Sequence, residues 1–238
     1  MRCTLSQRKQ HALELFAGLP GRYDRMGAVL SFGQDPRWRA AMVSAIAPAP
    51  GQRVLDVATG TGLVAFALAR RGAEVVGLDQ SEDMLSGARA RQAALGPLRG
   101  SVSFVRGEAE HLPFDDDSFD ALSFTYLLRY VDDPAQTMAE LVRVLKPGGR
   151  IGMLEFAVPP PGPLRTLWRL HTRLGLPLIG RLVSPAWYEV GRFLGPNIEE
   201  FHTREDDLGG LWRRAGIDQV TERPMSFGAG LVMWGVKR

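Results

Sequence analysis

One short run constrains the fold most: an apolar stretch at 54–58 leads directly into Gly60-Thr61-Gly62, and a helical pattern follows up to Gly72. A buried strand, a tight glycine turn and an apolar helix in this order form the first part of a βαβ unit. With Ala65 the turn has the spacing G-x-G-x-x-A, which lets the backbone approach a bound nucleotide. A packing role for these glycines is the alternative.

The same alternation continues along the chain. Helices are expected to begin at Ser81 and Pro134, each with acidic residues at its start. We expect the second of these to extend to Leu145 and to end in the turn at 146–149. Further strands are expected at 74–78, 102–105, 121–124, 151–154, 217–222 and 231–236, with a helix at 205–215. The sequence therefore predicts a Rossmann-like, doubly wound, mainly parallel α/β sheet of seven strands with helices on both faces.

A proline-rich stretch at 159–163 interrupts this pattern, because it can continue neither a helix nor a central strand. We expect a helical insertion after the fifth strand. The predicted segments are an N-terminal helical part that covers the active site (1–48), a nucleotide-binding core (49–158), a basic amphipathic insertion or lid (159–203), and a closing helix and strands (204–238).

Composition excludes several classes of protein. The chain of 238 residues is 45% hydrophobic, carries a net charge of +3 and has one cysteine, so it forms no internal disulfide. That small excess of charge does not predict nucleic-acid binding, and four scattered histidines predict no metal site. No signal peptide or apolar run of spanning length is evident. We expect a cytoplasmic protein, monomeric or homodimeric.

The acidic residue inside the first strand, Asp56, narrows the choice of ligand. A pyrophosphate near this carboxylate would be disfavoured by about 1 to 4 kcal/mol at 4 Å, whereas a cationic ligand would be attracted. S-adenosylmethionine carries a sulfonium and an ammonium group and no phosphate. The sequence therefore favours S-adenosylmethionine over NAD, and a nicotinamide-dependent oxidoreductase is the less favoured alternative.

A series of motifs then resembles the class I S-adenosylmethionine-dependent methyltransferases. They are the glycine turn with Asp56, Asp79 at the end of the next strand, and the segments 107–114, 117–120 and 143–150. Their order and spacing together are specific.

A narrower resemblance, to the ubiquinone and menaquinone biosynthesis C-methyltransferases, covers nearly the whole chain from Phe16. It is carried by segments at 22–26, 30–33, 154–156 and 176–182, together with Trp38. The chain departs from that family at Tyr130 and Gly27, in the expected acceptor pocket. The resemblance implies methylation of a ring carbon of a polyprenylated quinol. Another aromatic or small lipophilic acceptor is the alternative, and a catalytically silent donor-binding module is a third hypothesis.

The resemblance also implies roles for individual residues. Gly60, Thr61 and Gly62 would line the methionine part of the donor, Asp79 would bind its ribose, and Glu108 with Ala109 would face the adenine. Further expected donor contacts are Asp56, Gln80, Met84 and Thr125. On the acceptor side the candidates are Arg129, Tyr126 and Tyr23.

Carbon methylation of a quinol requires an electron-rich ring, and a phenol with a pKa of about 10 is almost entirely neutral at pH 7. A cation near the phenolic oxygen would stabilise the phenolate. Arg129 is expected to do this directly or through a water, and its alternative role is that of a solvated or helix-capping arginine. His202 is a weaker candidate for a general base.

Positive charge concentrates in the insertion, where five arginines and one acid lie between Leu164 and Arg192. If 164–174 is helical, Arg165, Arg169 and Arg173 form one stripe and an apolar face lies elsewhere. This pattern predicts reversible contact with an anionic membrane surface. A lid helix with a solvated arginine face is the alternative.

Overall fold

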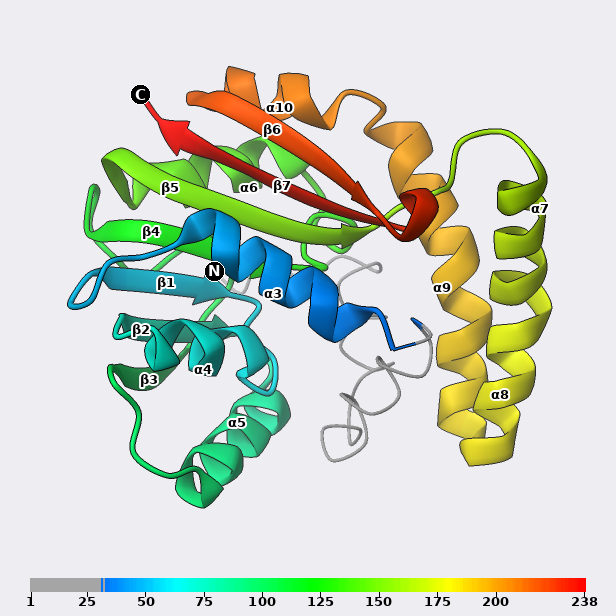
Figure 1. Cartoon of the computed structure of the whole chain (residues 1–238), viewed down its shortest axis with the longest axis horizontal. Helices are drawn as coiled ribbons and strands as arrows, with labels where there is room; N and C mark the ends of the chain where they lie inside the picture. The colour runs from blue at the N-terminus through cyan, green and yellow to red at the C-terminus, as the bar shows by residue number, and fades with distance from the viewer. Residues whose placement is uncertain (1–30, 32) are drawn as a thin grey trace, which may run out of the picture.

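The computed structural model describes residue 31 and residues 33–238, so the candidate Tyr23 lies outside the described residues. A seven-stranded sheet with the order β3-β2-β1-β4-β5-β7-β6 forms the centre (Figure 1). The first five strands pair in parallel, and β7 joins β5 and β6 in antiparallel fashion. The strands are β1 (Arg53–Val57), β2 (Glu74–Asp79), β3 (Ser101–Arg106), β4 (Phe119–Thr125), β5 (Leu145–Phe156), β6 (Ile217–Met225) and β7 (Gly230–Lys237). The predicted fold is confirmed.

Helices cover both faces of this sheet. Helices α3 (Asp35–Ile46) and α4 (Leu63–Arg70) pack on one face around Trp38 and Phe66, and α5 (Glu82–Ala94) follows at the β3 edge. Helices α6 (Pro134–Arg143) and α10 (Leu208–Arg214) pack on the other face, around Trp212. Both layers bury large apolar side chains, which supplies the main driving force for folding.

The local chemistry explains where these helices begin. The Ser81 side chain accepts a hydrogen bond from the Met84 N–H at the start of α5, and the Asp133 carboxylate accepts two at the start of α6. Two predicted boundaries were wrong. Helix α6 ends at Arg143, and Leu145 pairs with Phe119 as the first residue of β5, because a buried apolar residue at that position suits either element. Helix α10 begins at Leu208, since the Asp207 carboxylate caps it.

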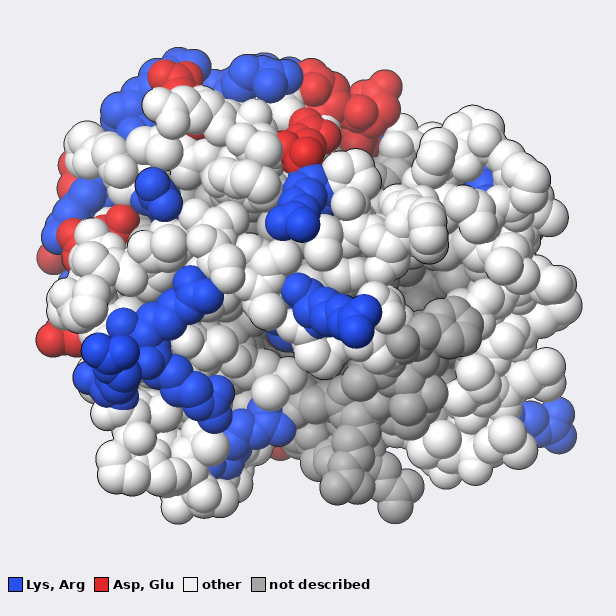
Figure 2. All heavy atoms as spheres, viewed as in Figure 1, with Lys and Arg blue, Asp and Glu red and all other residues white. Residues whose placement is uncertain are grey.

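After β5 the chain forms the predicted helical insertion. It consists of α7 (Pro163–Leu170), a π-helical turn η1 (His171–Gly175), α8 (Leu176–Val183) and the long α9 (Pro185–Arg204). Figure 1 places α7, α8 and α9 together beside the sheet, and Figure 2 shows that this part of the visible face carries few charges. A short turn, η2 (Ser226–Gly228), joins β6 to β7. Within the described residues, no helix is both long enough and apolar enough to cross a membrane.

Candidate active site

A cavity opens where β1, β2 and β4 end, at the edge where open parallel sheets bind their ligands. Eight of the residues predicted from the sequence line it: Gly60, Thr61, Asp79, Gln80, Met84, Ala109, Thr125 and Tyr126. Four predicted residues are not among the described residues of its wall: Asp56, Gly62, Glu108 and Arg129.

The glycine turn shapes one side of the cavity. Gly62 has a φ of +81°, and a Cβ atom there would lie 2.7 Å from the Phe66 ring, so both conformation and space require glycine. Its N–H donates to the Thr59 carbonyl over 2.9 Å, and α4 starts with the next residue. Gly62 therefore acts by shaping the turn, while Gly60 and Thr61 face the cavity.

Asp79 joins the ends of two strands. Its carboxylate accepts hydrogen bonds from the Gly60 N–H at 2.8 Å and from the Ser81 N–H at 2.9 Å. Burial raises the pKa of this carboxyl, and the backbone donors oppose that rise. Each carboxylate oxygen can accept more than one hydrogen bond, so Asp79 can still receive ribose hydroxyls.

Asp56 lies behind the turn. Its carboxylate accepts hydrogen bonds from the hydroxyls of Thr59 and Ser123, each at 2.6 Å, and the residue is only 1% exposed. Burial raises its pKa to about 6, although Ser123, Thr59 and the positive charge of Arg39 lower it. Its charge can therefore act on a ligand only from a distance, and the carboxylate also holds the turn in place.

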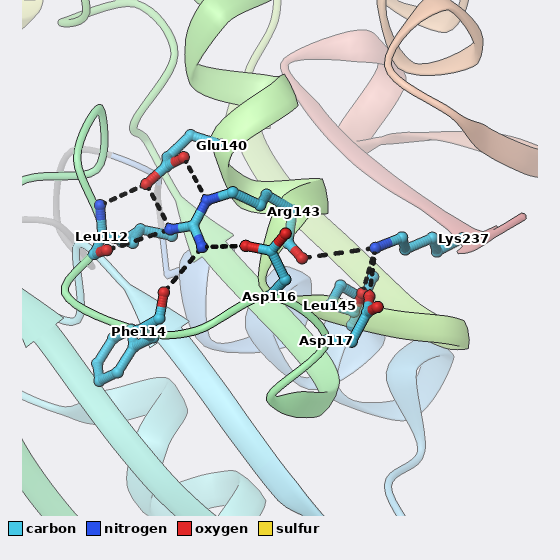
Figure 3. A network of polar contacts seen from close by, with 8 residues as sticks. All are labelled: Leu112, Phe114, Asp116, Asp117, Glu140, Arg143, Leu145 and Lys237. Atoms are coloured by element: carbon cyan, nitrogen blue, oxygen red, sulfur yellow. Dashed lines mark hydrogen bonds and ion pairs between the residues drawn. The ribbon is translucent and has the colours of Figure 1, made fainter.

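A loop after β3 forms another side of the cavity. Ala109 and Glu110 line the cavity, whereas the backbone of Glu108 forms an isolated antiparallel β-bridge with His111. Figure 3 shows what anchors this loop: Arg143 of α6 donates to the carbonyls of Leu112 and Phe114 and pairs with Glu140. The neighbouring Arg143 guanidinium lowers the pKa of Glu140. The Glu140 carboxylate also accepts a hydrogen bond from the Leu112 N–H, so α6 fixes the cavity wall through Arg143 and Glu140.

An aromatic pair closes the side of the cavity next to β4 and β5. Tyr126 has the left-handed φ of +56° and stacks on Phe156, with ring centroids 4.6 Å apart. Its hydroxyl donates to the Asp35 carboxylate, and burial raises its pKa well above the usual value. A hydroxyl that donates to a carboxylate and resists ionisation does not serve as a base. Tyr126 is therefore a wall of the site.

Behind this pair lies an ion pair that the sequence did not predict. The Arg129 guanidinium donates to the Glu155 carboxylate over 2.9 Å, and both side chains are almost fully buried. The guanidinium lies 5.3 Å from the Tyr126 ring and 4.7 Å from the Tyr130 ring. Because both tyrosines line the cavity, the Arg129 cation is separated from it by single aromatic rings. Arg129 is neither a solvated arginine nor a helix cap.

Sequence reasoning also missed Arg39. This side chain lines the cavity, pairs with Asp35 over 2.7 Å, and lies 5.4 Å from the Tyr126 ring. It is a cation at a wall where an anionic ligand group could be received. The signal available from the sequence was its position beside Trp38, in a segment that resembles the quinone methyltransferases.

His202 does not reach this cavity in the described structure. Its Nε2 lies 2.7 Å from the Phe156 carbonyl oxygen, which connects α9 to the end of β5. Burial lowers its pKa. Within the described residues, no group of three or more His, Cys, Asp or Glu side chains is placed to hold a metal ion.

Comparison with known proteins agrees with this geometry. The family model described as "ubiE/COQ5 methyltransferase family" matches residues 4–237. The chain belongs to that family. It is thus an S-adenosylmethionine-dependent methyltransferase, and the alternative of a nicotinamide-dependent oxidoreductase is wrong.

Curated relatives match over nearly the full length. The chain is 41% identical over 239 residues to a demethylmenaquinone methyltransferase of Clavibacter sepedonicus, covering 100% of this chain and 94% of the relative. It is 38% identical to a ubiquinone/menaquinone biosynthesis C-methyltransferase of Desulfotalea psychrophila, covering 94% and 89%.

A solved S-adenosylmethionine-dependent methyltransferase of Thermotoga maritima shares the fold, with a TM-score of 0.62 at 23% identity, covering 94% of this chain and 99% of that one.

Proposed function

We propose that this protein transfers the methyl group of S-adenosylmethionine to a ring carbon of a polyprenylated quinol. One observation carries the proposal: an aromatic wall with a buried cation behind it adjoins the donor cavity, in a chain 41% identical to a demethylmenaquinone methyltransferase. The wall suits a flat ring, and the cation suits a phenolate.

The described residues fit the donor. Gly60 and Thr61 would hold its methionine part, Asp79 its ribose, and Ala109 its adenine, with Gln80, Met84 and Thr125 as further contacts. Arg91 fixes Thr61 by donating to its carbonyl and its hydroxyl. Arg39 is placed to receive the donor's carboxylate. When bound, the donor supplies a methyl group on a positively charged sulfur.

On the acceptor side, we assign an electrostatic role to Arg129. Its charge is permanent, and desolvation makes a buried charge act more strongly on its surroundings than one in water. Glu155 holds the guanidinium behind Tyr126 and Tyr130 and offsets part of its charge, but at Tyr130 the Arg129 charge has a larger effect on the pKa than the Glu155 charge. The cation would therefore favour the phenolate without accepting a proton. Holding the methyl group and the ring carbon in line supplies the rest of the catalysis. The methyl–sulfur bond would break as the carbon–carbon bond forms, S-adenosylhomocysteine would leave, and the proton of the methylated ring carbon would pass to solvent as the ring regains its aromaticity.

We also propose reversible membrane contact. The exposed leucines of the insertion support it better than the stripe formed by Arg165, Arg169 and Arg173. Arg169 and Arg173 both pair with Glu199 of α9, which offsets much of their charge. The insertion also exposes a row of leucines, of which Leu178 and Leu182 on α8 are 61% and 88% exposed. An apolar row next to basic side chains suits the boundary between lipid headgroups and acyl chains. The enzyme would then meet its acceptor at the inner face of the membrane.

The test is transfer of an isotopically labelled methyl group to demethylmenaquinol that is kept reduced. Formation of labelled menaquinol supports the proposal. A product from other lipophilic aromatics but none from this quinol would favour the alternative acceptor class, and donor binding without turnover would favour a silent module.

A further inference from the structure

A second cavity, separate from the donor cavity, lies between the insertion and the sheet. It has a volume of about 870 Å³, at the upper end of the range for small-molecule sites. Its wall is mainly apolar. Its lining includes Trp38, Phe156, Leu167, Leu174 and Phe227. We propose that this apolar cavity binds the polyprenyl tail of the acceptor, an inference that rests on the proposed function.

The position of the cavity is the first argument. Phe156 lines the apolar cavity, and Tyr126, which stacks on it at 4.6 Å, lines the donor cavity. Trp38 packs edge-to-face with Phe156, with ring centroids 5.8 Å apart, and lines the apolar cavity as well. The two cavities therefore meet across one stacked pair of rings. An acceptor whose ring lies against Tyr126 in the donor cavity would reach the apolar cavity with a tail that passes around the edge of this pair.

Two leucines of the cavity wall are largely exposed to solvent. Leu167 and Leu174 line the cavity and are nevertheless 62% and 56% exposed, so the cavity is open along α7 and η1. Exposed leucines cost free energy unless they are covered by something apolar. A branched hydrocarbon chain has the required chemistry, and the proposed membrane-facing row continues from this opening to Leu182.

Two backbone irregularities at the rim form the third argument. Phe227 is 81% exposed and is held at a φ of +59° in η2, at the edge of the same cavity. A bulky residue in this conformation is strained and often marks a functional position. On the opposite side, η1 is a π-helical turn, which is also frequent at ligand sites. Both irregularities keep apolar side chains at the opening.

The test compares two reduced naphthoquinols that differ only in the tail, one with two isoprene units and one with a methyl group, without membranes. The wild-type kcat/KM should be at least tenfold higher for the prenylated acceptor, through KM. Leu167→Asp, which places a charge in the cavity wall, should reduce this ratio to below threefold without changing donor affinity. Leu182→Asp is the matched control, because Leu182 does not belong to the described wall of this cavity, and it should keep the wild-type ratio.

A second measurement locates the tail directly. A prenylated quinone with a photoreactive diazirine at the end of its tail should label peptides from 163–176 or 226–229. Labelling confined to other peptides would overturn the inference, as would equal kcat/KM values for the two acceptors in the wild type. If neither quinol is methylated, the proposed function itself fails, and this result is distinct from methylation that ignores the tail.

Discussion

Arg129 and Glu155 form a buried ion pair at 2.9 Å, with Arg129 in the turn after β4 and Glu155 near the end of β5. Burial raises the pKa of the Glu155 carboxyl above its usual value, and the Arg129 cation opposes part of this rise. Because β4 and β5 are neighbours in the sheet, this pair joins the turn after β4 to the end of β5, directly behind the aromatic wall of the site. The pair leaves neither buried charge without a partner, and in our proposal it also serves catalysis.

We predict that Arg129→Ala lowers kcat for quinol methylation about 100-fold, the size of effect seen when one stabilising group is lost from an active site. Donor affinity should change less than threefold. The variant should also lose about 3 to 5 kcal/mol of unfolding free energy, because Glu155 would remain buried without its partner. Turnover, calorimetry and chemical denaturation measure the three quantities.

The double variant Arg129→Met with Glu155→Gln separates the two roles. Replacing both charges should restore most of the lost stability, since an unpaired buried charge no longer remains. Turnover should stay low. A double variant that regains wild-type kcat would show that the Arg129 cation has no part in the chemistry.

Asp56 should make donor binding depend on pH. Its pKa of about 6 means that its charge is lost as the pH falls from 7.5 to 5. The affinity for the cationic donor should fall about threefold to tenfold over this range, and Asp56→Asn should show a weak, nearly constant affinity. Asp116→Asn, at an exposed carboxylate of the Arg143 network, is the control and should keep the wild-type profile.

Asp56 should also make the folding stability depend on pH, but in the opposite direction from donor affinity. Because the folded state binds this proton more tightly than the unfolded state, the contribution of Asp56 to stability decreases as the pH rises from about 4 to about 6. The shift corresponds to roughly 3 kcal/mol at most. Urea unfolding across this range should show Asp56→Asn gaining on the wild type as the pH rises. A constant difference would contradict the raised pKa.

Arg39 should bind the carboxylate of the donor. Arg39→Met is expected to weaken S-adenosylmethionine binding about tenfold, and Arg37→Met, an exposed neighbour on α3, should have no effect. Methylthioadenosine lacks the amino acid part, so its affinity should be the same in both variants and the wild type. Equal weakening of both ligands by Arg39→Met would indicate a structural role instead.

Membrane contact should depend on the leucine row. In flotation with anionic vesicles, Leu178→Asp and Leu182→Asp should each reduce the bound fraction severalfold, whereas Thr221→Asp on β6 should not. Glu199→Gln should increase binding, because it releases Arg169 and Arg173 from their partner. Recovery of the wild type entirely in the unbound fraction would refute the contact.

Much of the fold could be predicted because the buried strands and the glycine turn are continuous in sequence. The apolar strands at 54–58 and 74–78, separated by a helix and the turn at Gly60, predicted the parallel core and the position of the donor cavity. Boundaries such as Leu145 could not be predicted, since an apolar residue there is buried in either a helix or a strand. The Asp207 cap likewise competes with the adjacent acids Glu205 and Asp206 as a helix start.

The site was harder to predict where it depends on contacts between distant segments. Arg129 and Glu155 are 26 residues apart, and Asp35 and Tyr126 are 91 apart, so neither pairing has a local signal. Asp56 was expected to act at the ligand, yet its carboxylate turns toward Ser123 on the neighbouring strand. Whether a strand residue faces the cavity or the core depends on packing that the sequence pattern does not give.

The position of the transferred methyl group tests the central claim most directly. Reduced demethylmenaquinol would be incubated with the enzyme and a donor carrying an isotopically labelled methyl group, and the product would be examined by NMR. We predict a methyl group bonded to the ring carbon and absent from both oxygens. A methyl ether, or an unmodified quinol beside a donor that is consumed on another acceptor, would contradict the account.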